Sequence, residues 1–347
     1  MKRRIVAGVP AGDTAEVRLA ATGPAGILIA GGVCCSIESP AMWLISDDGV
    51  ERLVLPDGMR TTTFLDLESG PGGFVGGGVR SDGDPNDPQY TGALWHSADG
   101  RTWTEVDPRA GDLGPGDVRD VAWTGAAWFA VGSRDEGRRS DGTVWRSGDG
   151  VEWRRIAVGD PAIAGPEEEA LQRILPFKGG LFAQGGSGTH ADRLACEDQA
   201  GEGTVGIPGA SLSLSCSWLV TTHWISTDGT TWLRMPPVEA PFDGPPLPAP
   251  PGGRRLISHR VLDVGEPGLV VVDAEEPRRA DGSDSVGTWI SDDGATWRPV
   301  GGPGQFPKDL FLQDFVVAGR TIVGIGEDGW DQPNGTDVVV WIGSVTP

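Results

Sequence analysis

The stretch Trp145-Arg-Ser147-Gly-Asp149-Gly-Val-Glu-Trp153 follows the pattern W-x-S-x-D-G-x-x-W, and this pattern recurs along the chain. Further copies begin at Trp43, Trp95, Trp224 and Trp289, and a sixth unit begins at Trp341 but stops before its turn. The first copy is degenerate, with one extra residue after Trp43 and Arg52 in place of the second tryptophan. Such a repeat predicts a fold built from successive copies of one structural unit.

Each copy reads as a β-hairpin. An Asp-Gly pair between alternating strands is a strong hairpin signal, because glycine accepts the positive φ that the turn requires. Serine and aspartate side chains hydrogen-bond to the backbone of their own turn, and the flanking tryptophans are expected to pack between neighbouring sheets. The expected turn residues are Ser46, Asp48, Ser97, Asp99, Ser147, Asp149, Ser226, Asp228, Ser291 and Asp293.

A second motif precedes each hairpin: an apolar strand, a turn with glycine, and a strand of small residues, as in Val121–Gly132 and Phe315–Gly326. Two hairpins per repeat give four strands, which is the composition of a propeller blade. We therefore expect an all-β fold, a six-bladed β-propeller of four-stranded antiparallel blades, with residues 1–347 forming one domain. No transmembrane segment is expected, since no apolar run approaches about 20 residues.

The last unit lacks a fourth strand. Arg3–Gly8 resembles Arg154–Gly159, the outermost strand of the third blade. We expect this N-terminal strand to complete the last blade, because closure leaves no open sheet seam. The basic start is not followed by the apolar core of a signal peptide. As written, the chain is expected in the cytoplasm, or secreted or in the cell envelope if the true start lies upstream.

The net charge of −21 limits the classes of partner. A protein that binds phosphate backbones needs a basic face, and no Lys/Arg cluster stands out from this acidic background. Nucleic acid and anionic membranes are therefore excluded as expected partners. Cations, sugars and basic protein segments suit the composition.

The repeated hairpin resembles the Asp box, or BNR repeat, of sialidases, sortilin-type receptors, some glycoside hydrolases and the photosystem II assembly propeller. The resemblance extends over nearly the whole chain through its repetition. It departs in one respect, because the usual box is S-x-D-x-G-x-T-W and here one residue is missing between Asp and Gly. In that family the box is a structural turn opposite the ligand site, so the resemblance implies architecture and not activity.

The catalytic set of sialidases is not found in the sequence. That family uses three arginines, a tyrosine paired with a glutamate, and an aspartate, and an Arg-Ile-Pro segment usually carries the first arginine. The nearest segment here is Arg173-Ile-Leu-Pro176, and the only tyrosine, Tyr90, is placed by sequence in an Asp/Pro-rich loop. We predict no sialidase activity.

Long polar connections between the second and third strands of each blade are the expected place for function, since loops on rigid scaffolds commonly carry it. They are 80–93, 133–143, an insertion at about 187–223, 273–287 and 327–337. A Pro-rich stretch at about 234–255 is expected to be a connection between blades, because the repeat resumes after it. For any single loop, the alternative interpretation is a solvent-exposed surface without a binding role.

Two of these loops are rich in short carboxylates. The calcium candidates are Asp82, Asp84, Asn86 and Asp87 in one loop and Asp328 and Asp331 in another. Calcium takes six to eight oxygen ligands, so backbone or water oxygens would have to complete either site, and no glutamate closes the loop as in an EF-hand. No cofactor is otherwise expected.

The insertion at about 187–223 holds Cys196 and Cys216 and is flanked by His190 and His223. Three interpretations remain: a disulfide that closes the loop, a Cys2His2 zinc site, or four unrelated residues. The spacing lacks the C-x-x-C pairs that mark zinc sites. The adjacent Cys34 and Cys35 are expected to pack on a strand, because a bond between them would be strained.

The sequence favours a binding module, expected to be a monomer, that presents an acidic face built from loops to a protein or carbohydrate partner. The alternative is an enzyme acting on a glycan or small molecule at the central depression. Its catalytic candidates are Tyr90, His190, Arg193 and His223. A convergent cluster in a closed pocket would favour the enzyme.

Overall fold

The computed structural model describes residues 14–34, 39–84, 87–135, 140–189, 220–235, 262–265, 268–274, 286–300, 310–318, 321–328 and 337–344. These residues form β-strands, with one short 3-10 turn, η1 (Asp57–Thr61), and no α-helix among them. None of them lies in a helix long and apolar enough to cross a bilayer. The chain divides into two compact units, described in turn.

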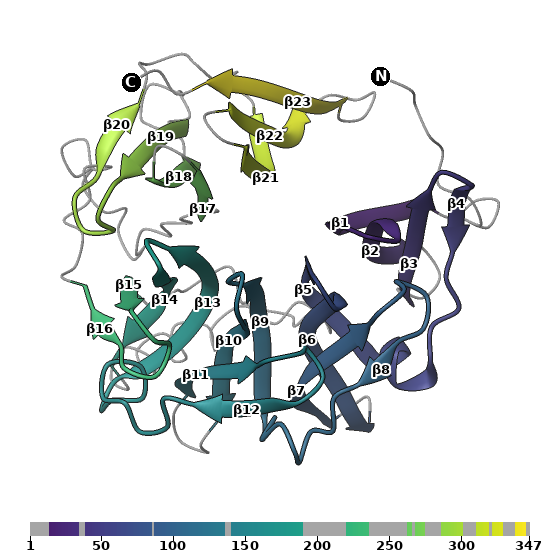
Figure 1. The fold of residues 1–347 in the computed structure, drawn as a ribbon, viewed down its shortest axis with the longest axis horizontal. Helices are drawn as coiled ribbons and strands as arrows, with labels where there is room; N and C mark the ends of the chain where they lie inside the picture. Colours follow the sequence, from purple (N-terminus) through teal and green to yellow (C-terminus); the bar gives the residue numbers. More distant parts are fainter. Residues whose placement is uncertain are drawn as a thin grey trace, which may run out of the picture. The chain divides into compact units, whose positions relative to one another are not determined.

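The first unit contains three four-stranded sheets (Figure 1). The first sheet has β1 (Thr14–Gly23), β2 (Gly26–Cys34), β3 (Ser39–Ser46) and β4 (Gly49–Arg52). The second has β5 (Thr62–Gly70), β6 (Gly73–Asp84), β7 (Asp87–Ser97) and β8 (Thr104–Glu105). The third has β9 (Gly116–Trp123), β10 (Trp128–Asp135), β11 (Ser140–Ser147) and β12 (Trp153–Ile156).

The fourth sheet has β13 (Glu168–Phe177), β14 (Gly180–Gly188), β15 (Val220–Ser226) and β16 (Leu233–Arg234), with residues assigned to both units. The second unit also holds β17 (Leu262–Gly265), β18 (Gly268–Ala274), β19 (Val286–Ser291) and β20 (Arg298–Val300), and then β21 (Leu310–Ala318), β22 (Thr321–Asp328) and β23 (Asp337–Ser344). Strands in every sheet are joined in sequence order. The all-β fold of four-stranded antiparallel units is confirmed; Arg3–Gly8 lies outside the described residues.

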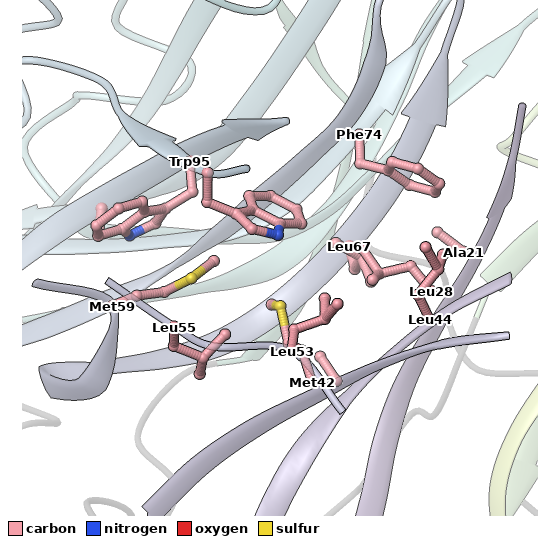
Figure 2. Close-up of a cluster of buried hydrophobic side chains, with 13 residues drawn as sticks. Ala21, Leu28, Met42, Leu44, Leu53, Leu55, Met59, Leu67, Phe74 and Trp95 are labelled. Atoms are coloured by element: carbon pink, nitrogen blue, oxygen red, sulfur yellow. The ribbon is translucent and has the colours of Figure 1, made fainter. Parts of the chain in front are cut away.

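Tryptophans of the repeat fill the space between consecutive sheets of the first unit, as expected. Trp95 and Trp103 of the second sheet share a buried cluster with Met42 and Leu44 of the first (Figure 2). Trp145 lies in an equivalent cluster between the second and third sheets. At roughly 25 cal/mol per Å2, a ring that buries about 200 Å2 contributes on the order of 5 kcal/mol before entropy is counted.

Glycines in the first turn of the first and second sheets make room for an aromatic ring of the next sheet. A Cβ atom on Gly23 would lie 2.5 Å from Phe74 Cζ, and one on Gly70 would lie 2.5 Å from Trp128 Cζ2. Both distances are shorter than any real carbon contact, so these positions accept no side chain unless the ring moves. The glycines therefore set how closely two sheets approach.

Gly70→Ala is expected to lower the free energy of unfolding by about 1–3 kcal/mol, because the methyl group overpacks against Trp128. Urea denaturation would measure the change. Gly148→Ala is the matched control, since a Cβ atom there has nothing within 4 Å, and it should change stability by less than about 0.5 kcal/mol. Equal effects from the two variants would contradict this account of sheet spacing.

The prediction of a loop over 80–93 was wrong. Strands β6 and β7 remain paired out to Asp84 and Asp87, and Tyr90 pairs with Ser81. Tyr90 is thus part of a strand, and not of a loop as the sequence suggested. An antiparallel hairpin needs only backbone pairing, and polar side chains on its solvated faces do not prevent it. The strands bounding the other connections also extend into the ranges assigned to loops.

Candidate functional site

The aspartates of the repeated turns bind the backbone that follows them. Asp99 Oδ1 accepts N–H groups from Arg101 at 2.8 Å and Thr102 at 2.6 Å. Equivalent pairs of bonds reach Asp149, Asp228 and Asp293. The side chains therefore supply the turn with hydrogen bonds that the sheet does not provide.

The serines complete these turns. Ser147 Oγ donates to Asp149 Oδ1 at 3.0 Å and accepts the Gly150 N–H at 2.9 Å. Ser226 and Ser291 make the same two bonds in their turns. Gly150 has a φ of +83°, and the φ values of the glycines at the same place in the other four copies are also positive, as the sequence predicted.

The turns are longer than a two-residue hairpin in the third sheet. Ser147 pairs with Trp153, so residues 148–152 lie between the strands, and Trp153 Nε1 donates to the Gly150 carbonyl at 2.8 Å. The degenerate first copy differs, because Ser46 pairs with Gly49 directly across Asp47 and Asp48. The missing second tryptophan thus coincides with a tighter turn.

These hydrogen bonds keep the aspartates ionised. The N–H of Thr102 lowers the pKa of Asp99 to about 2, and the N–H groups of Thr231 and Thr296 lower the pKa values of Asp228 and Asp293 to about 2. A general acid must hold a proton near neutral pH. The turn aspartates are therefore suited to holding the turn and poorly suited to proton transfer.

Folding lowers the pKa of Asp293 from 3.8 to about 2, so its stabilising effect is complete above pH 4 and is lost as the pH falls toward 2. We expect Asp293→Asn to flatten the decline in urea midpoint between pH 4 and pH 2. The control is Asp292→Asn, since Asp292 is exposed and makes no side-chain hydrogen bond among the described residues. A control that flattens the profile equally would contradict the role of Asp293.

A second group of charged residues lies on the first strands of successive sheets, and two of them directly follow a β-bulge. The register of β5 shifts between Phe64 and Asp66, and that of β9 shifts at the residue before Asp120. Arg173 holds the equivalent position in β13. It lies three residues after Ala170, whose carbonyl faces Gly185, just as Asp120 lies three residues after Asp117, whose carbonyl faces Gly132. We call Asp66, Asp120 and Arg173 the first-strand cluster.

The first-strand cluster links consecutive sheets. Asp66 Oδ2 accepts the Val121 N–H of the third sheet at 2.9 Å, and Asp120 Oδ2 accepts the Ile174 N–H of the fourth at 2.6 Å. Arg173 Nη1 also donates to Asp120 Oδ1 at 3.0 Å. Each carboxylate thus binds the backbone of the sheet that follows it, at the same position of the repeat.

Burial changes the acidity of this pair. Asp120 is 3% exposed; burial, and then the charge of Asp66, raise its pKa well above the usual value. Burial also raises the pKa of Asp66, although the Arg173 charge opposes the change. Two interacting carboxyl groups in such surroundings retain a proton that isolated aspartates lose. Acid–base catalysis uses such pairs, and so do structural networks.

The two aspartates are expected to respond differently to amide substitution. In Asp66→Asn the amide oxygen can still accept the Val121 N–H and the amide nitrogen can donate to Asp120, while the like-charge repulsion is removed. We expect its free energy of unfolding at pH 7 to equal or exceed that of the wild type. Asp120→Asn deprives Arg173 of its carboxylate and should cost about 1.5–3 kcal/mol.

Urea titrations across pH would test both variants. Because folding raises the pKa values of this pair, the wild type loses stability as pH rises above about 4, toward and through the folded-state pKa. The advantage of Asp66→Asn over the wild type should therefore grow with pH. A loss of unfolding free energy that is equal in both variants and independent of pH would contradict the raised pKa values of the pair.

The sequence did not single out Asp66 or Asp120, and it used Arg173 only to reject an Arg-Ile-Pro segment. The available signal was an Asp or Arg that interrupts an apolar strand at the same place in successive repeats, as at Asp314 after the bulge in β21. That signal is weak, because the bulge shifts the alternation of side chains along the strand.

The catalytic candidates are found in unrelated surroundings or outside the described residues. Tyr90 is 45% exposed on β7. His223 is 9% exposed on β15, with ring centroids 5.2 Å from Phe182 and 5.9 Å from Trp297. His223 thus forms part of an aromatic stack. His190 and Arg193 lie outside the described residues.

Most ligand candidates also lie beyond what the structure describes. Cys35, Cys196, Cys216, Asn86 and Asp331 are outside the described residues, and only the backbone is described for Cys34, Asp82, Asp84, Asp87 and Asp328. Most of the insertion at about 187–223 and of the Pro-rich stretch at about 234–255 is likewise outside them. Within the described part, no three His, Cys, Asp or Glu side chains are grouped to hold a metal.

No protein-family model matches this chain, and no curated protein matches it in sequence. Among solved structures it is similar to a protein of unknown function from Dyadobacter fermentans, with 11% identity, 96% of this chain and 98% of that chain covered, and a TM-score of 0.52. The β-propeller domain of the Trilobed protease from Pyrococcus furiosus gives 9% identity, 96% and 86% coverage, and a TM-score of 0.48.

A neuraminidase-like protein of A/little yellow-shouldered bat/Guatemala gives 10% identity, coverage of 98% of this chain and 100% of that chain, and a TM-score of 0.47. At such low identity a likeness concerns the fold alone. The repeated four-stranded meanders support a β-propeller fold. Both a binding role and a catalytic role are compatible with this fold.

Proposed function

We propose that residues 1–347 form a single six-bladed β-propeller, an Asp-box protein closed by its N-terminal strand, that acts as a monomeric binding module for a protein or carbohydrate partner. Six successive meanders, the last with three described strands, support the blade count. Asp314 of β21 follows a bulge as Asp66 and Asp120 do, so the sixth meander repeats the pattern of the earlier ones.

The observation that carries the binding proposal is that the aspartates of the repeated turns and of the first strands bind backbone groups of the protein itself. Asp99 and its equivalents bind their own turns, while Asp66 and Asp120 bind the next sheet. These carboxylates therefore hydrogen-bond to backbone within the protein. Recognition is then left to the connections between second and third strands.

Those connections suit a cationic or hydroxyl-rich partner. The five ranges 80–93, 133–143, 187–223, 273–287 and 327–337 together hold more than half of the chain's net charge of −21. Carboxylates accept hydrogen bonds from sugar hydroxyls, pair with basic side chains and bind calcium. We propose calcium as an ion that the groups around Asp82 and Asp328 take up.

The insertion can be removed without disturbing its sheet. Strands β14 and β15 are neighbours, and Ser187 Oγ lies 3.0 Å from Thr222 Oγ1, so a short turn can replace residues 190–219. We expect this variant to melt like the wild type but to lose the partner that the wild type binds. A matched control replaces residues 136–139, the β10–β11 connection, with four Gly/Ser residues.

Thermal melting against a panel of mono- and oligosaccharides, with calcium or a chelator, and capture of proteins on immobilised chain would measure binding. Ligand at about a hundred times its dissociation constant adds roughly 2.7 kcal/mol, which raises melting by several degrees. Full binding by the variant without 190–219 would place recognition elsewhere. No response in either assay would count against a binding module.

The alternative is an enzyme that acts on a glycan or small molecule, and the neighbouring carboxyl groups of Asp66 and Asp120, whose pKa values are raised chiefly by burial, favour it. Two carboxyl groups with separated acidities are the usual catalytic pair of glycoside hydrolysis. Turnover of glycoside substrates by the wild type, abolished in a folded Asp66→Asn variant, would establish the enzyme. Absence of turnover from both would favour the binding module.

A further inference from the structure

Two arginines stand directly opposite each other in the third sheet. Arg146 of β11 pairs with Arg154 of β12, so their side chains leave the same face of the sheet. Like charges directly opposite on antiparallel strands are destabilising. Such a pair is unexpected in this chain, because its net charge is −21 and carboxylates outnumber the positive side chains.

Neither guanidinium is neutralised within the part of the chain that the structure describes. The ion pairs and hydrogen bonds there involve other arginines, such as Arg155 with Asp112 at 2.8 Å, and include no side-chain bond of Arg146 or Arg154. Asp149 and Glu152 lie nearby, but Asp149 binds its own turn and neither forms an ion pair with the two arginines.

The arginines line a shallow hollow of about 430 Å3 with Ser147, Gly148, Asp149, Glu152 and Trp153. Arg146 is held over the Phe129 ring, with its Cζ 5.9 Å from the ring centroid. Such stacking restricts the guanidinium and leaves its N–H edge available. The hollow therefore combines space and two guanidinium groups, one of them held by a ring, with the carboxylates of Asp149 and Glu152 also in its lining.

The same position carries no pair of positive charges in the other four described hairpins. The residues opposite each other are Leu44 and Glu51, His96 and Thr104, Ile225 and Leu233, and Ile290 and Arg298. Since other hairpins of the repeat form with apolar or neutral residues at this position, the hairpin does not require the arginine pair. A local departure that costs stability is typical of a functional position.

We propose that Arg146 and Arg154 form a binding site for an oxyanion, a carboxylate or phosphate group carried by a ligand. Planar guanidinium groups bind such anions through paired hydrogen bonds, and two of them across one hollow give a site for three oxygen atoms or more. The site belongs to the end of the third sheet formed by the 148–152 turn, and is separate from the connections proposed to bind the partner.

The test uses the full chain with inorganic phosphate and malonate as probes, at constant ionic strength set with sodium chloride. Each probe is followed by thermal melting and by isothermal titration. We expect at least one probe to raise the melting temperature of the wild type, and Arg154→Thr to weaken its affinity at least tenfold. A response to phosphate alone or to malonate alone identifies the group recognised.

Arg154→Thr should fold, because Thr104 occupies the same position in the second sheet, and without anion it should melt at or above the wild-type temperature. Arg146→Gln provides a second variant with the same expected loss of affinity. Arg298→Thr is the matched control, since Arg298 faces Ile290 and should keep full binding. Equal stabilisation by chloride, no response to either probe, or undiminished affinity in Arg154→Thr would overturn the site.

Discussion

Hydrogen bonds from one sheet to the backbone of the next are the constraint on which the first unit depends. Asp66 and Asp120 each accept an N–H from the following sheet, directly beside a bulge that interrupts the pairing of their own strand. A carboxylate buried as deeply as that of Asp120 is stable only if its oxygens are satisfied, so the bulge, the acid and the neighbouring strand must be placed together. Tryptophan packing then fills the outer space between the same sheets.

Carboxylates in this chain do three different things, according to their surroundings. In the repeated turns, exposed aspartates are held ionised by backbone N–H groups. On the first strands, the carboxyl groups of Asp66 and Asp120 join sheets, and burial raises their pKa values. In the long connections they give the chain its strong negative charge. The same residue type is thus a turn cap, a link between sheets or a surface charge, and desolvation and hydrogen bonding decide which.

The arginine pair shows why a repeat is useful for finding function. Residues that every copy shares, such as Ser147 and Asp149, are explained by the turn they build. Arg146 and Arg154 differ from their equivalents and make no contribution that the turn needs. In a repeat protein, positions at which one copy differs from the others therefore separate the residues needed for folding from the residues that bind a ligand.

The sequence by itself determined the β-hairpin unit, its tryptophan packing and the positive φ of its glycines, because these depend on residues within a few positions of one another. It misplaced Tyr90 in a loop, since polar composition does not reveal how far two strands remain paired. Only the tertiary structure brought Asp66, Asp120 and Arg173 together, as they come from three sheets, and their acidity arises from burial that no local pattern encodes. The pairing of Arg146 with Arg154 across two strands likewise depended on the register, which the turn length fixes.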